Sequence, residues 1–97
     1  MIIRIFKATV APELHQEFEM QFKAVSVPAV NSYDGLISVE IGKPTRWNPH
    51  EFVMISKWTE ESKLVNFVGE NLNEAYIPKN LEKYILDYSV THFRKNE

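Results

Sequence analysis

The chain has 97 residues, of which 11 are basic and 13 acidic, and it contains no cysteine. The net charge of −2 gives no strong positive field, which argues against a nucleic-acid partner, and the absence of cysteine excludes disulfides, thiolate metal sites and a cysteine nucleophile. A chain of this length makes a single domain, 1–97.

No apolar stretch approaches the roughly 20 residues that a membrane span needs. The sequence passes from Met1 directly into a strand, without a positive leader or a small-residue cleavage site. We therefore expect a cytoplasmic protein with no membrane partner.

The first predicted strand, residues 2–10, is apolar on both faces. Because side chains alternate along a strand, Ile3 and Ile5 point to one side. The other side carries a second apolar set: Ile2, Phe6, Ala8 and Val10. A strand that is apolar on both faces belongs in the middle of a sheet.

An amphipathic helix is predicted to follow, beginning at Pro12 and Glu13. Its apolar residues recur at spacings of three and four: Leu14, Phe18, Phe22, Val25 and Ala29. Pro28 has no backbone N–H, so we expect a kink or a break there. Residues 31–35 should end the helix.

Residues 36–43 have the alternating pattern of an edge strand, with Ile37, Val39 and Ile41 on one face. A long hairpin connection over residues 42–50 leads to residues 52–58, which are again apolar on both faces and are predicted to form the second central strand.

The second helix is expected to be capped by Thr59, with Glu60 and Glu61 near its positive end. Leu64, Phe67 and Val68 then face the sheet, and Gly69 ends the helix. Residues 69–80 are irregular, with room for one short helical turn, and such a segment can cover a pocket.

The last strand places Leu86, Tyr88 and Val90 on one face, and the charges of Arg94 and Lys95 suit an edge that must not recruit other strands. The resulting βαββαβ order, with strands one and three central, predicts an α+β, ferredoxin-like antiparallel sheet of spatial order 4132.

Right-handed crossovers put both helices on one face of this sheet. The other face then exposes more isoleucine and valine than a soluble monomer tolerates. We therefore expect a homodimer that forms through the open sheet face.

Several segments, in this order along the chain, resemble the antibiotic biosynthesis monooxygenase (ABM) family of dimeric α/β barrel proteins: residues 1–10, the turn Asp34-Gly35-Leu36, residues 51–58 with the acidic helix start after them, and residues 74–78. The resemblance covers almost the whole chain. It implies a homodimer whose relatives include enzymes that oxidise polycyclic phenols or quinols with O₂ and no cofactor, heme degraders, and proteins without known activity.

The resemblance implies particular site positions. The phenol-oxidising members have an Asn on strand three, a Trp at its end and a Tyr on the next helix. These positions read Met54, Trp58 and Leu64 here, so only the tryptophan is retained. A tryptophan at a strand end is also a common packing residue with its N–H satisfied.

The heme-degrading members have an Asn on strand one, a Trp on the second helix and a His after it. Those positions fall on or beside Lys7, on Phe67 and on Tyr76, and all three differ. Tyrosine can ligate heme, so heme binding through Tyr76 stays as a third alternative.

A cofactor-free oxygenase needs a base, and His92 is the preferred candidate because it shares a strand face with Leu86, Tyr88 and Val90. The competing interpretation is a histidine that only hydrogen-bonds at a strand end or dimer seam. His15 and His50 are expected near the surface. No two histidines have ligand spacing, so no metal site is expected.

The sequence therefore favours a monooxygenase that oxidises an aromatic or quinol-like molecule with O₂ and no cofactor, with His92 as base and Tyr76 orienting the substrate oxygen. The pocket is expected to be shaped by apolar side chains: Trp58, Phe67, Met54 and Leu64. The alternative is a non-catalytic small-molecule-binding or stress-response dimer, favoured by the apolar residues at positions 54 and 64.

Overall fold

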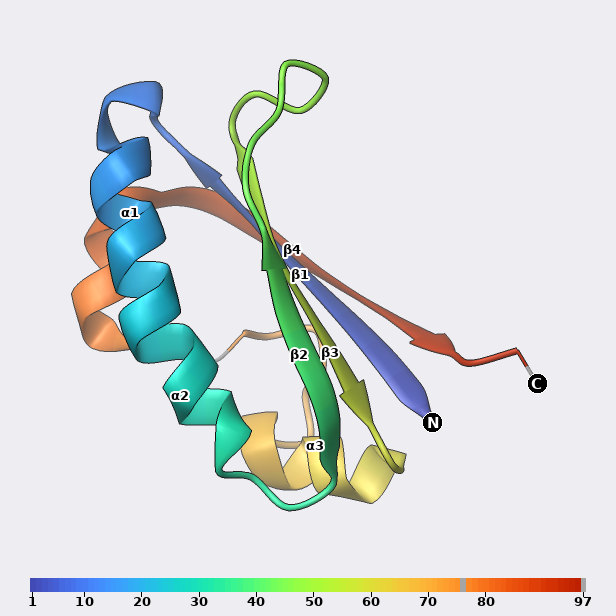
Figure 1. Ribbon diagram of the computed structural model, residues 1–97. Helices are drawn as coiled ribbons and strands as arrows, with labels where there is room; N and C mark the ends of the chain where they lie inside the picture. The colour runs from blue at the N-terminus through green and yellow to red at the C-terminus, as the bar shows by residue number, and fades with distance from the viewer. Residues whose placement is uncertain (76, 97) are drawn as a thin grey trace.

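The computed structural model describes residues 1–75 and 77–96 (Figure 1). Four antiparallel strands form one sheet in the order β2-β3-β1-β4, which is the predicted 4132 order counted from the other edge. The helices cover one face of this sheet, as predicted. The elements in chain order are β1 (Ile2–Val10), η1 (Pro12–Leu14), α1 (His15–Gln21), η2 (Phe22–Ser26), α2 (Val27–Asn31), β2 (Leu36–Gly42), β3 (Glu51–Trp58), α3 (Glu61–Val68), η3 (Lys79–Tyr84) and β4 (Ile85–Arg94).

The two central strands are β1 and β3, which pair without a register shift from Ile2 opposite Trp58 to Thr9 opposite Glu51. Ile5 lies opposite Ile55, and Phe6 lies opposite Met54. Since side chains alternate, the even-numbered residues of both strands lie under the helices, where Ala8 and Val10 are fully buried.

The opposite side of the sheet carries no helix. We call this side the open face and define it by its apolar side chains: Ile3, Ile5, Val53, Ile55 and Phe93. Each is at least partly exposed, and Phe93 is more than half exposed. The open face therefore presents a row of apolar side chains to solvent, with Lys7, Glu40 and Lys57 beside it.

Register shifts correct two predictions for the edge strands. The pairing of β2 with β3 shifts between Leu36 and Ser38, so Leu36 packs against the core and Ile37 is 48% exposed. A shift opposite Thr9 and Val10 likewise puts Ile85 against the core and leaves Leu86 70% exposed. The predictions that Ile37 shares a face with Val39, and Leu86 with Tyr88, are therefore wrong.

The first helix passes Pro28 without a break and continues to Asn31. The proline ring cannot donate a hydrogen bond to the carbonyl four residues back and would clash with it. The five residues of η2, which ends two positions before Pro28, adopt a wider π-helical turn. This turn accommodates the missing hydrogen bond and avoids the clash of the proline ring with the carbonyl. The predicted break is thus replaced by a local widening of the helix.

The second helix, α3, ends at Gly69 as predicted, with φ at +92°, a value that favours glycine. Its N-cap position is Glu60, without a side-chain cap, so the predicted cap at Thr59 is wrong. Thr59 instead donates its backbone N–H to the Gly35 carbonyl at 2.8 Å, which ties the start of α3 to the turn before β2.

The side chains beneath the helices form two buried clusters. One surrounds Phe18 and Phe22, and the other consists of Val30, Trp58 and Leu64. The short helix η3, which the sequence did not predict, adds Leu81 and Tyr84 to the first cluster. Met54 packs against both clusters, so it marks the boundary between them.

None of the helices in the described ranges has the length and hydropathy that crossing a membrane requires.

Candidate functional site

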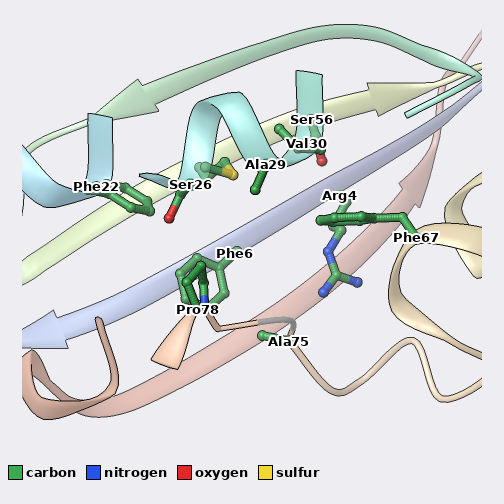
Figure 2. A pocket seen from close by; sticks show the side chains of 11 residues that line it. Arg4, Phe6, Phe22, Ser26, Ala29, Val30, Ser56, Phe67, Ala75 and Pro78 are labelled. Carbon is green, nitrogen blue, oxygen red and sulfur yellow. The ribbon is translucent and has the colours of Figure 1, made fainter. Parts of the chain in front are cut away.

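A cavity lies between the covered sheet face and the helices, with about 480 Å³ of unfilled space counted out to its mouth (Figure 2). Much of this space is open to solvent, and water-sized molecules can occupy only about 40 Å³ inside it, less than the few hundred Å³ of a typical small-molecule site, so a larger ligand requires the cavity to widen. Strands, helices and the segment after α3 all contribute to its lining: Arg4, Phe6, Phe22, Ser26, Ala29, Val30, Met54, Ser56, Phe67, Ala75 and Pro78.

The lining is mostly apolar and aromatic. Arg4 is the only charged side chain among these described lining residues. The Ser56 hydroxyl accepts a hydrogen bond from Trp58 Nε1 at 3.0 Å, so one of its lone pairs is already used. The cavity therefore has a largely apolar wall that contains one cation.

Arg4 is the third residue of β1 and points to the covered face, where only 4% of its surface is exposed. Its Nη1 and Nη2 donate hydrogen bonds of 3.0 Å to the backbone carbonyls of Leu72 and Glu74. Figure 2 shows its nitrogens pointing toward the segment that carries Ala75. Arg4 thus fixes the segment after α3 over the sheet.

His92 lies opposite Arg4 in the pairing of β1 with β4, and Arg4 Nη1 is 2.9 Å from His92 Nε2. A guanidinium group can only donate, so Nε2 accepts and the imidazole proton lies on Nδ1. Burial and, secondarily, the Arg4 charge lower the pKa of His92 below its ordinary value. His92 is therefore a neutral imidazole at neutral pH.

Burial also lowers the pKa of Arg4 to about 10, against a smaller opposing effect of Tyr88. At neutral pH the Arg4 side chain consequently keeps its positive charge inside the protein.

The His92 environment predicts a pH effect on stability. The folded pKa is below 6.5, the ordinary value, so on acidification the unfolded chain takes up this proton first. The stability contribution is complete above 6.5 and is lost as the pH falls toward the folded pKa. We expect urea denaturation at pH 7.5 and 5.5 to show a smaller loss for His92→Gln than for the wild type.

The matched control for this measurement is His50→Gln, in the exposed hairpin loop. This variant should keep the pH dependence of the wild type. If His92→Gln lost as much stability between the two pH values as the wild type does, burial and the Arg4 charge would not lower the pKa of His92 in the folded protein.

The structure brings together some of the residues that the sequence singled out. Met54 and Phe67 line the cavity. Trp58 is fully buried behind Phe67, with the two rings stacked at 5.5 Å between centroids. Leu64 is buried in the same cluster as Trp58 and does not line the cavity. Tyr76 lies outside the described residues.

Sequence reasoning missed Arg4. The available signal was a charged residue at a covered position of a central strand, between Ile2 and Phe6. Of the other histidines, His15 donates from Nε2 to the Val10 carbonyl at 2.8 Å, so it is tied to the end of β1. Within residues 1–75 and 77–96, no three His, Asp or Glu side chains converge as a metal-ligand set.

Residues 1–77 match the family model described as antibiotic biosynthesis monooxygenase, which confirms the resemblance inferred from the sequence. No curated protein matches the sequence significantly.

Solved structures share this fold at low sequence identity. A conserved protein from Methanosarcina mazei superposes with a TM-score of 0.73 at 20% identity, over 99% of this chain and 94% of that chain. SnoaB from Streptomyces nogalater, a cofactor-independent oxygenase solved as an asparagine-to-alanine variant, gives 0.72 at 17% identity, over 99% and 93%. An arginine-to-serine variant of MhuD with two manganese protoporphyrin IX molecules per active site gives 0.71 at 17% identity, over 98% and 94%. At these identities the likeness shows the fold.

Proposed function

This chain belongs to the antibiotic biosynthesis monooxygenase family, and from that premise we propose that it is a cofactor-independent monooxygenase that oxidises an aromatic or quinol-like small molecule with O₂. The observation that carries the proposal is the mostly apolar, aromatic-lined cavity in which buried Arg4 is the one charged side chain among the described lining residues. The shared fold with SnoaB, itself a cofactor-independent oxygenase, is consistent with it.

The proposed reaction draws all its electrons from the substrate. A ring CH₂ carbon loses two hydrogens and gains one oxygen atom of O₂ as a carbonyl, and the second oxygen atom leaves as water. Before O₂ reacts, the substrate must lose a proton to give a delocalised carbanion or phenolate, which passes an electron to O₂. A fixed cation in a water-excluded site stabilises such an anion strongly.

Arg4 is therefore assigned the task of stabilising the substrate oxyanion, and the walls formed by Phe6, Met54 and Phe67 exclude water from it. His92 is proposed as the base. Its lowered pKa keeps it in the neutral, proton-accepting form, although Nε2 must leave Arg4 before it accepts a proton. Tyr76 is proposed to orient the substrate oxygen, on sequence grounds alone.

The second candidate function is a non-catalytic dimer that binds a small molecule, as a carrier or in a stress response. It is favoured by Met54, which puts a thioether into the cavity wall where the phenol-oxidising relatives have an amide. The third candidate, heme binding, draws on the shared fold with MhuD and on Tyr76. A hemin titration that gives a Soret band would favour it.

We further propose that two copies pair through the open face, which would bury the apolar side chains that no helix of this chain covers. The cavity lies on the other side of the sheet, so such pairing leaves its mouth unobstructed by the partner sheet. We also propose a cytoplasmic location.

The test is native mass spectrometry of the protein purified from its own host, followed by O₂ consumption with the molecule found bound. We expect one O₂ consumed per substrate, and with ¹⁸O₂ one labelled atom in the product. His92→Gln should lower kcat by about 10²-fold or more, whereas His50→Gln should not. Return of the bound molecule unchanged, with no O₂ uptake, would favour the binding dimer instead.

A further inference from the structure

We propose that the cavity selects ligands that carry an ionised oxygen, a carboxylate or a phenolate, and seats this oxygen on the Nε–Nη2 edge of Arg4. The inference rests on the proposed function and deepens it, because it names the chemical class of the molecule that enters the same site.

The hydrogen bonds of Arg4 leave one edge of the guanidinium group available. Of the five N–H groups of an arginine, Nη1 uses two, toward the Leu72 carbonyl and His92 Nε2. Nη2 uses one, toward the Glu74 carbonyl. The Nε–H and the second Nη2–H have no partner in the part of the chain that the structure describes. These neighbouring donors form the edge that binds both oxygens of a carboxylate.

This edge belongs to a side chain in the cavity wall. Arg4 is almost fully buried, and the cavity is lined by its side chain together with rings such as Phe6 and Phe67. Because Arg4 lines the cavity, the cavity is the natural route to Nε.

The positive charge of Arg4 also has no counter-ion among the residues that the structure describes. The salt bridges found within residues 1–75 and 77–96 join Lys43 to Glu19 and Lys63 to Asp34, and neither includes Arg4. The Glu74 contact uses the backbone carbonyl, so it brings no negative charge. A buried cation without a counter-ion is costly, and an anionic ligand would supply the missing charge.

A purely structural role for Arg4 accounts for only part of this arrangement. The bonds to the Leu72 and Glu74 carbonyls explain how Arg4 holds the segment after α3. They do not explain an arginine whose remaining donors face a cavity lined by Phe6, Phe22 and Phe67. Those rings favour an aromatic body, so the ligand class is an aromatic acid or an acidic phenol.

The inference is tested by equilibrium binding of matched probes under anaerobic conditions, measured by isothermal titration calorimetry. The probes are 2-naphthoate and its neutral analogue 2-naphthamide, which share the same ring system. We expect the wild type to bind 2-naphthoate at least about tenfold more tightly. A third titration uses 4-nitrophenol at pH values above and below its own pKa. Tighter binding of its ionised form would show that the site accepts a phenolate as well as a carboxylate.

Two variants locate the effect. Arg4→Met keeps an unbranched side chain but removes the charge, so it should bind the two naphthyl probes equally. Arg4→Lys keeps the positive charge but loses the two parallel N–H donors of the guanidinium, so it should retain only part of the preference for 2-naphthoate. This variant also provides a test if Arg4→Met does not fold. Arg46→Met, in the exposed hairpin loop, should bind as the wild type does.

Three results would overturn the inference. The first is equal binding of the two naphthyl probes by the wild type, the second is no binding of any anionic probe, and the third is a preference for 2-naphthoate that Arg4→Met keeps. The outcome is independent of turnover. An anion preference without O₂ uptake would support this inference and contradict the monooxygenase proposal. Oxidation of a neutral substrate without an anion preference would support the monooxygenase proposal and contradict this inference.

Discussion

If the proposed pairing through the open face is correct, a double variant with Ile5→Asp and Ile55→Asp is expected to be monomeric at concentrations where the wild type pairs. The two residues are direct partners across β1 and β3 at the middle of the open face. Pairing of two sheets would bury these carboxylates without partners, at a cost of several kcal/mol. Because about 1.4 kcal/mol corresponds to a tenfold change, the dissociation constant should rise by at least about 10³-fold. Sedimentation equilibrium measures this directly.

The matched control is Met20→Asp, which places the same charge at an exposed apolar residue of α1, on the helix side of the sheet. This variant should remain dimeric, and the circular dichroism of both variants should match that of the wild type. Sedimentation of the wild type at the mass of one subunit would contradict the proposed pairing, as would a double variant that stays paired.

Replacing Trp58 by alanine should lower the free energy of unfolding by about 3–5 kcal/mol, the usual cost of removing a large buried aromatic side chain. Trp58 is fully buried between Val30, Leu64 and the ring of Phe67, and its Nε1 donates to the Ser56 hydroxyl. The variant loses the packing and the hydrogen bond together. Urea denaturation provides the measurement, at one fixed protein concentration because the proposed pairing would make stability depend on concentration.

Trp47→Ala is the matched control, since this second tryptophan is 74% exposed in the hairpin loop, where its ring contacts only the Arg46 guanidinium among the described aromatic and cation contacts. Its substitution should change the free energy of unfolding by no more than about 0.5 kcal/mol. Similar decreases in the free energy of unfolding for Trp58→Ala and Trp47→Ala would show that burial does not determine how much each tryptophan stabilises this fold.

The strand order could be predicted because it follows from local patterns. Segments that are apolar on both faces identify the central strands β1 and β3, and right-handed crossovers fix the side on which the helices lie. The register of the edge strands could not be predicted in the same way. Strict alternation assigns Ile37 and Leu86 to the core, but one inserted residue in each strand shifts the buried position to Leu36 and Ile85.

The site was only partly predictable, for a different reason. Apolar wall residues such as Met54 and Phe67 follow from the faces of their strand and helix. The role of Arg4 depends on backbone carbonyls 68 and 70 residues further along the chain, and any residue type carries a carbonyl. No pattern of side chains in the sequence records such a contact. Trp58, with its N–H bonded to Ser56, fits the packing interpretation that the sequence had left open.

The π-helical turn at η2 also sets the rotational phase of the first helix. A regular α-helix rotates by about 100° per residue, and a π turn accommodates one extra residue before the cycle repeats. Phe18, before the turn, points into the core, while Ser26, Ala29 and Val30, at its end and beyond, line the cavity. A chain shorter by one residue in this stretch would rotate the second half of the helix by about 100° and would present a different set of side chains to the cavity.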